Sequence, residues 1–144
     1  MKRFSLRDFV AESNRIEGIE TVKELEVDAH RTFLSLPVTV ESLVQFVGVV
    51  ASAQLRDRMG MDVRVGRHFP TRGGPYVRNK LDSILNGLPQ SPYDTHREYE
   101  MLHPFMDGNG RSGRALWLHM MGGIEKVPLG FLHTWYYESL DANR

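Results

Sequence analysis

Cysteine is absent from this 144-residue chain, which excludes disulfide frameworks and zinc sites built on thiolates. Long apolar runs are also missing, so no segment reaches the length of a membrane-spanning helix. The N-terminal residues MKRFSLRDF contain no apolar core of a secretory signal, and we expect a cytoplasmic chain without a membrane partner. The 18 basic and 18 acidic residues cancel, which removes the simplest argument for nucleic-acid binding.

The rest of the composition is that of one ordinary folded domain, with 41% hydrophobic and 25% charged residues. No repeat or linker divides the chain, so we treat residues 1–144 as a single domain. Helix-start patterns, in which an acidic residue follows Ser or Thr by three positions, begin at Ser5, Thr21 and Ser91. Together with the apolar spacing they predict an all-α fold, with helices near residues 5–17, 21–35, 39–59, 75–87, 91–102, 110–122 and 131–141.

The segment DVRVGRHFPTRGGP, residues 62–75, departs from the helical pattern. Val63 and Val65 alternate with Arg64 and Gly66, which favours a short strand. The prolines and glycines that follow exclude a helix. We expect either a small β-hairpin or an open strand edge to which a partner strand can add.

The residues GNGRSG, from Gly108 to Gly113, match the pattern G-x-G-x-x-G. A dinucleotide-binding fold needs a strand before this pattern, but the preceding residues DTHREYEML are predicted as helix, so that fold is excluded. A P-loop is excluded as well, because its lysine is missing. The glycines still allow backbone N–H groups to turn inward, and a helix starting near Gly110 adds its positive dipole end. Arg111 and Arg114 on one face of that helix then favour a bound polyanion such as a di- or triphosphate. An ordinary loop–helix junction with exposed arginines is the alternative.

Two further groups precede this glycine segment. Asp107 would repel a bare phosphate but can hold Mg²⁺ that bridges phosphate oxygens, and a helix-capping aspartate is the alternative. The imidazole of His103, when neutral, can accept a proton from an attacking hydroxyl. Residues 103–114 therefore predict a nucleotide-phosphate site with its own general base.

A carboxylate on an apolar helix face is the other unusual feature. Glu17 shares one face of the first predicted helix with Leu6, Phe9, Val10 and Ser13. If it is buried there, Glu17 needs a cationic partner. The alternative is that Glu17 ends the helix at its solvent edge, directly before Gly18.

The residues HPFMDGNGRSGR, 103–114, resemble the signature of the Fic domain family, H-P-F-x-D/E-G-N-G-R-x-x-R, at every fixed position. The lead-in YDTHREYEML, the segment VRVGRHFP and the helix after the signature are also similar to that family. The resemblance implies a single all-α Fic-like domain with a small β-hairpin flap. It further implies transfer of AMP from ATP to a hydroxyl side chain of a target protein, with Mg²⁺ as the metal.

The resemblance also gives a role to each matching position. His103 would be the general base and Asp107 the magnesium ligand. The ATP phosphates would be bound by Gly108, Asn109, Gly110, Arg111 and Arg114, the last at the γ-phosphate. The flap would align a target peptide by strand addition through Val63, Arg64, Val65, Gly66, Arg67 and His68. Gly110 fits the AMP-transferring members, because the phosphorylating Doc toxins carry a lysine there.

Residues 13–18, SNRIEG, resemble the inhibitory S/T-x-x-x-E-G/N motif of many Fic proteins. This implies an inhibitory helix over about 1–18, in which Ser13 and Glu17 take part and Glu17 pairs with Arg114, so that ATP cannot bind productively. Three alternatives to autoinhibited AMP transfer stay open, namely removal of AMP as the main reaction, a phosphotransferase or toxin-like activity, and a silent peptide-binding module. The sequence also leaves open the target protein and whether the chain forms a homodimer.

Overall fold

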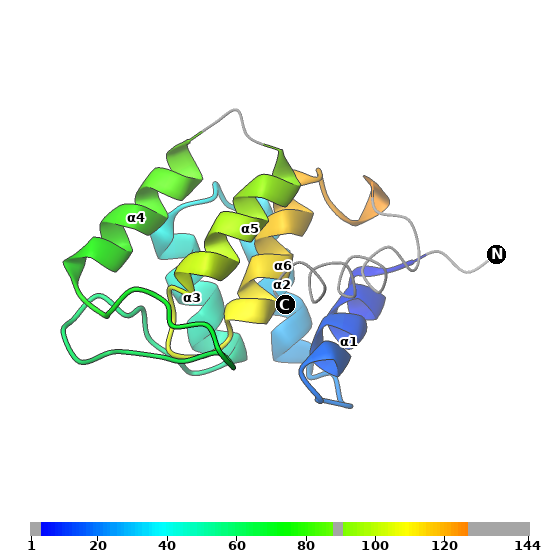
Figure 1. The fold of residues 1–144 in the computed structure, drawn as a ribbon. Helices are drawn as coiled ribbons and strands as arrows, with labels where there is room; N and C mark the ends of the chain where they lie inside the picture. Colours follow the sequence, from blue (N-terminus) through cyan, green and yellow to red (C-terminus); the bar gives the residue numbers. More distant parts are fainter. Residues whose placement is uncertain (1–3, 88–90, 127–144) are drawn as a thin grey trace.

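The computed structural model describes residues 4–87 and 91–126 of the chain. Within these ranges six α-helices follow one another (Figure 1), with the bounds α1 Leu6–Ile16, α2 Glu24–Ser35, α3 Val40–Val50, α4 Pro75–Asn86, α5 Pro92–Leu102 and α6 Asn109–Met120, and a 3₁₀ turn at Ile124–Lys126. The described part of the chain contains no β-strand, so the predicted all-α class is confirmed. The helix predicted near 131–141 lies outside the described residues. None of the helices in the described ranges is long and apolar enough to cross a membrane.

Side-chain caps explain where the first helices begin. The Ser5 hydroxyl accepts a hydrogen bond from the Asp8 amide at 3.2 Å, and the Asp8 carboxylate accepts one from the Ser5 amide at 2.9 Å. Helix α2 begins at Glu24, three residues later than predicted, because the Glu26 carboxylate accepts a hydrogen bond from the Lys23 amide at 2.8 Å. The start pattern at Thr21 is therefore not the one that the chain uses.

Helix α3 is shorter than the sequence predicts, because it ends at Val50 and not near residue 59. Residues 51–59 are locally compatible with a helix, but tertiary contacts require an irregular chain there. Ser52 adopts a φ of 51°, which turns the backbone out of the helix. Leu55 then pairs with Phe105 in an isolated antiparallel bridge, and this pairing joins the segment to the loop between α5 and α6.

The predicted β-hairpin flap is not formed. Within residues 62–75 only Val65 and His68 pair, through reciprocal backbone hydrogen bonds of 3.0 and 2.8 Å around a turn in which Gly66 has a φ of 59°. The next hydrogen-bonded pair of such a hairpin would join Val63 to Pro70, and Pro70 has no N–H group to donate. One bridged pair therefore stands where the sequence predicts two strands.

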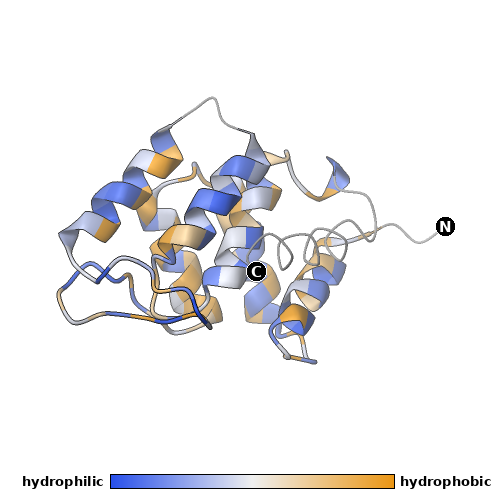
Figure 2. Ribbon diagram, in the orientation of Figure 1, coloured by the Kyte–Doolittle hydropathy of each residue, from blue (hydrophilic) through white to orange (hydrophobic). Residues whose placement is uncertain are grey.

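Helix α6 is the centre of the arrangement, because it packs against α1, α2, α3 and α5. Nine of its twelve residues are buried. The larger hydrophobic core lies around it and contains Leu43, Leu81, Phe105 and Leu116. Figure 2 shows that hydrophilic colour covers much of the viewed faces of α4 and α5, the outer layer in this view.

Helix α1 lies beside this bundle and packs mainly on α2 and α6 among the described helices (Figure 1). A second, smaller apolar cluster joins it to α6, built on buried Phe9, Trp117 and Leu118. Helix α1 is thus held by this separate cluster, together with the polar contacts described below.

Candidate active site

The loop between α5 and α6 is closed by its own side chains. Phe105 is fully buried in the larger core. The Asn109 side chain accepts a hydrogen bond from the Phe105 amide at 2.8 Å and donates one to the Phe105 carbonyl at 2.8 Å. These two bonds tie the Asn109 side chain to the backbone of Phe105. The side chain of Asn109 shapes the loop, a role that the sequence did not indicate.

Gly108 begins α6 in the left-handed conformation, with a φ of 78°. A Cβ at this position would lie 2.7 Å from the Ala51 Cβ, so both the backbone conformation and the close packing against the end of α3 require glycine. No side chain in the described residues caps α6. The first N–H groups of a helix have no intrahelical partner, and these therefore form an anion-binding end.

Arg111 is anchored by a buried carboxylate on α2. Its Nη1 atom lies 3.4 Å from Glu26 Oε2, and the two residues are 7% and 6% exposed. The other oxygen of Glu26 accepts hydrogen bonds from the Asn14 side chain at 3.2 Å and from the Lys23 amide. These contacts hold the Glu26 carboxylate in one position, because breaking any of them would leave a buried polar group unpaired. A cation near the start of α6 is thus paired within the protein.

Arg114 is joined to α1 by three hydrogen bonds. Its Nε donates to the Ser13 hydroxyl at 2.8 Å, and its Nη2 donates to the Ser13 carbonyl at 3.0 Å and to Glu17 Oε1 at 2.7 Å. Arg114 is 5% exposed and Ser13 is fully buried, whereas 40% of the Glu17 side chain is exposed. The ion pair between Glu17 and Arg114 expected from the resemblance is therefore present.

The end of α1 presents Glu17 to this arginine. Glu17 is the C-cap, and Gly18 follows with a φ of 78°. The Gly18 amide donates to the Arg15 carbonyl and the Ile19 amide to the Asn14 carbonyl, both at 2.9 Å, the pattern of a Schellman motif. Glycine at position 18 thus stops the helix directly after the carboxylate.

Gly110 leaves room for that carboxylate. A Cβ built on Gly110 would overlap Glu17 Oε1 and lie 3.2 Å from Arg114 Nη1. The Glu17 carboxylate therefore sits over the first turn of α6, where the free N–H groups of the helix begin. A side chain at position 110 and the carboxylate in its present place exclude each other.

His103 ends α5 in the left-handed conformation, with φ 52° and ψ 63°, which costs a non-glycine residue roughly 1–2 kcal/mol. Burial lowers the pKa of His103 below its ordinary value, the charge of Glu100 opposes this shift, and the charge of Arg56 adds to it. The ring also has a hydrogen bond to the backbone carbonyl of Glu100. The imidazole is neutral at neutral pH, which is the form that accepts a proton.

A cavity of about 510 Å³ collects most of the residues singled out in the sequence. Its lining includes His103, Asp107 and Glu17, the glycine segment from Gly108 to Arg111, and Val63, Arg64 and Val65 from the flap segment. Gly66, Arg67 and His68 are not among its lining residues, and Ser13 and Arg114 are linked to it through Glu17. His68 instead bonds to the Met101 carbonyl at 3.0 Å. Half of the predicted flap residues thus reach this cavity.

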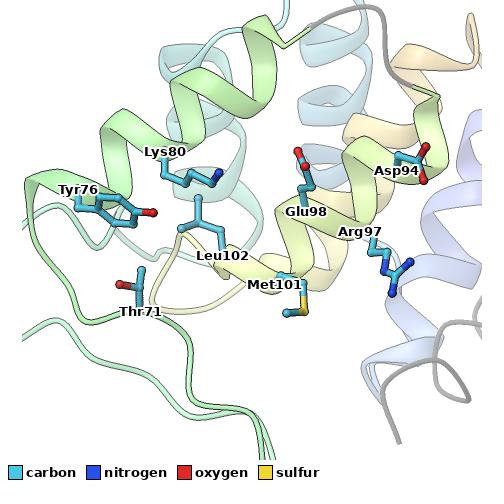
Figure 3. Close-up of a pocket in the computed structure, with 8 residues that line it drawn as sticks. All are labelled: Thr71, Tyr76, Lys80, Asp94, Arg97, Glu98, Met101 and Leu102. Carbon is cyan, nitrogen blue, oxygen red and sulfur yellow. The ribbon is translucent and has the colours of Figure 1, made fainter.

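A second cavity, of about 620 Å³, lies between α4 and α5. Figure 3 shows Lys80 of α4 and Glu98 of α5 pointing into the space between the two helices, with Tyr76 and Thr71 at one end. No residue of the 103–114 segment lines it. We therefore place the candidate active site in the cavity that contains His103.

Asp107 suits a magnesium ion that is held mainly by phosphate. The residue is exposed to the cavity, and one of its oxygens accepts a hydrogen bond from the Gly108 amide at 2.7 Å. The other oxygen is available to a cation that keeps several waters and binds through one carboxylate and substrate phosphates. Within the described residues, no group of three or more His, Asp or Glu side chains forms a metal site built from protein ligands alone.

Three contributors to the site were not found from the sequence, namely Asn14, Glu26 and Arg56. The sequence places Glu26 only within the second predicted helix. Asn14 occupies a variable position of the segment SNRIEG, residues 13–18. Arg56 is fully buried and donates hydrogen bonds to backbone carbonyls around His103. A polar residue at an inward position of a helical pattern was the available signal for Asn14 and Glu26, and none marks Arg56.

The segment that forms this site matches a known protein family. Residues 93–121, which contain the last ten residues of α5, the loop and all of α6, match the model of the Fic/DOC family. This match supports the Fic domain family, whose all-α fold agrees with the helices described above. The family is one of transferases that carry out AMPylation and related reactions. None of the curated proteins matches the chain.

Proposed function

We propose that this chain is a protein adenylyltransferase that moves AMP from ATP to a hydroxyl side chain of a target protein, and that Glu17 holds it in an inactive state. The observation that carries the proposal is the Glu17 carboxylate over Gly110, bonded to Arg114, in a cavity that also contains His103. The match of residues 93–121 to the Fic/DOC family supports the same reaction class.

The reaction is an in-line displacement at the α-phosphorus of ATP. The target hydroxyl oxygen forms a bond to the α-phosphorus, the bond from that phosphorus to the β-phosphate bridge oxygen breaks, and pyrophosphate leaves. His103 takes the hydroxyl proton, for which its lowered pKa keeps the imidazole neutral. The N-terminal N–H groups of α6 bind the phosphate oxygens, and this step needs mainly positioning and charge stabilisation.

Asp107 is the residue that would hold Mg²⁺, because it is exposed to the same cavity and precedes the glycine segment. When bound, the ion would supply positive charge that neutralises the phosphate oxygens. Val63 and Val65 line the same cavity, and we assign the alignment of the target peptide to them. Strand addition there has only the pair Val65–His68 as its template.

In the inactive state ATP competes with the protein's own carboxylate. Glu17 neutralises Arg114, the residue proposed for the γ-phosphate, and lies where the phosphates approach the start of α6. A triphosphate next to Glu17 would meet a like charge at short range, which disfavours binding. Release of Glu17 leaves Arg114 bonded to Ser13 and free to take a phosphate oxygen.

The activity is tested by incubating a cell lysate with Mg²⁺, labelled ATP and the Glu17→Gly protein. We expect label in a target protein, or in the chain itself, from ATP labelled at the α-phosphate and none from ATP labelled at the γ-phosphate. Glu17→Gly combined with His103→Ala should lose this labelling. Labelling from the γ-phosphate alone would instead show phosphotransfer, and binding of a partner without labelling would show a silent module.

The inhibitory role is tested by comparing wild-type protein with Glu17→Gly and with Glu20→Gly. Glu20 lies exposed three residues after Glu17, so its replacement makes the same change of net charge in the same segment. We expect Glu17→Gly to bind ATP at least about tenfold more tightly and to label targets faster, because one competing carboxylate is removed. Glu20→Gly should behave like the wild type, and equal ATP affinity in all three proteins would refute autoinhibition.

Removal of AMP from a modified target is a second reaction open to the same site, in which water attacks the phosphorus, the bond to the side-chain oxygen breaks, and AMP and the free hydroxyl are released. It is separated from AMP transfer by giving labelled, AMP-modified target to the wild-type protein and following the released nucleotide. Faster release by the wild type than by Glu17→Gly would assign Glu17 to this reaction and would contradict a purely inhibitory role.

A further inference from the structure

Arg56 is a buried cation without an acidic partner at ion-pair distance among the described residues. It is fully buried, and none of the ion pairs in the described part of the chain includes it. Burial lowers the pKa of its guanidinium, and the charge of Asp62 opposes that shift. A buried arginine in such surroundings is costly unless its N–H groups are all bonded.

Backbone carbonyls take the place of that partner. Two of them lie at the end of α5, where Arg56 Nε donates to the His103 carbonyl at 2.7 Å and Nη2 donates to the Leu102 carbonyl at 2.9 Å. The other two belong to Met61, just before the flap segment of residues 62–75, and to Thr71 within it, where Nη1 donates to their carbonyls at 3.1 and 2.8 Å. The planar guanidinium of Arg56 therefore joins the flap segment to the loop that begins at His103.

The backbone of Arg56 strengthens the same connection. Its amide donates to the Pro104 carbonyl at 2.9 Å, and its carbonyl accepts from the Gly74 amide at 3.0 Å. Three consecutive carbonyls, those of Leu102, His103 and Pro104, are thus all bonded to this one residue. The backbone of His103, with its unfavourable φ of 52°, is held from its carbonyl side by Arg56.

We propose that Arg56 is a positioning residue for His103, whose backbone it holds in the left-handed conformation so that the ring stays in the cavity. This inference rests on the proposed function, in which His103 is the general base. Because the same guanidinium binds Met61 and Thr71, it also sets the distance between the flap segment and the histidine. Arg56 itself does not line the cavity and does not touch the substrate.

The test compares Arg56→Gln and Arg56→Lys in the Glu17→Gly background, with Arg58→Gln as the matched control. Arg58 lies two residues away with an exposed side chain bonded to Gln54, outside the machinery described here. AMP transfer, ATP affinity and thermal unfolding are measured on each protein, together with an NMR titration of the His103 ring. The groups that act on this titration are Glu100, Arg56 and His68.

For Arg56→Gln we expect kcat for AMP transfer to fall by about 100-fold, the scale of a catalytic group misplaced by about 1 Å. ATP affinity should change less than about threefold, because the phosphate-binding end of α6 does not touch Arg56. The pKa of His103 should rise, because a positive charge that lowers it is removed. Arg56→Lys keeps the charge but cannot reach four carbonyls, so it should lose kcat while the His103 pKa stays low.

Three results would overturn the inference. Unchanged kcat in both variants would show that His103 does not need Arg56. An equal loss of kcat and of ATP affinity, or the loss of a cooperative unfolding transition, would assign Arg56 to the fold alone. If the Glu17→Gly reference itself transfers no AMP, the proposed function fails, while the His103 titration still decides whether Arg56 acts on this histidine.

Discussion

A histidine buried beneath helix α1 should make the protein sensitive to acid. His30 is 1% exposed, and its ring lies edge-on against Phe9 of α1 and Phe46 of α3. Its Nδ1 lies 2.7 Å from the Glu26 carbonyl, whereas its Nε2 has no hydrogen-bond partner among the described residues. Burial lowers the pKa of His30 to about 4, the contacts with Glu26 oppose the shift, and the charges of Arg111 and Arg114 add to it.

The direction and size of the pH effect follow from this shift. Because the pKa is lower in the folded protein than the ordinary 6.5, folding favours the neutral ring. The contribution of the neutral His30 ring to the free energy of unfolding is fully present above about pH 6.5 and is lost as the pH falls toward 4. Between pH 7.5 and pH 5 the loss is about 2 kcal/mol, from a shift in which each pKa unit corresponds to about 1.4 kcal/mol.

The assay is urea unfolding of the wild type and of His30→Leu at pH 7.5 and pH 5. Other groups that titrate in this range act in both proteins, so the difference between their pH effects isolates His30. We expect the wild type to lose about 2 kcal/mol more than the variant over this interval. Equal losses in both proteins, or an NMR titration that places the His30 pKa near 6.5, would refute the reasoning.

Two further substitutions test the contacts at the start of α6. Glu26→Gln leaves the buried Arg111 without its counter-charge and should lower the free energy of unfolding by roughly 3 kcal/mol, whereas the exposed Glu24→Gln should change it by less than about 1 kcal/mol. Similar urea midpoints for these two variants would mean that the Glu26–Arg111 pair contributes little. Gly108→Ala should cost roughly 1–3 kcal/mol from its φ of 78°, and more from overlap with the Ala51 Cβ. Adding Ala51→Gly should recover the part due to overlap, and no recovery would contradict that contact.

The parts of the site that lie close together in the sequence were predictable. Residues 103–114 combine a histidine, a carboxylate, glycines and two arginines within one loop and the first six residues of α6, so their spacing alone predicts a phosphate site. The pairing of Glu17 with Arg114 spans 97 positions and followed only from the resemblance of SNRIEG to an inhibitory motif. The helices with side-chain caps, such as α1 with Ser5 and Asp8, were also placed correctly because a cap is a local interaction.

The remaining features depend on contacts between distant segments. Arg56 binds carbonyls 46 and 47 positions away, and Glu26 binds Arg111 across 85 positions, so no local pattern marks either residue. The early end of α3 has the same origin, because the pairing of Leu55 with Phe105 outweighs a helical preference in residues 51–59. In the flap segment the alternation of Val63 and Val65 predicted strands, but Pro70 removes the donor that the next ladder pair needs.

The central claim, transfer of AMP to a hydroxyl group, is tested most directly by the chemical identity of the product. Mass spectrometry of peptides from the protein labelled by Glu17→Gly in the presence of ATP and Mg²⁺ identifies the added group and the modified side chain. We predict an added AMP on a serine, threonine or tyrosine, and its absence when His103→Ala is combined with Glu17→Gly. A phosphate in its place, or the same AMP adduct without His103, would contradict the account.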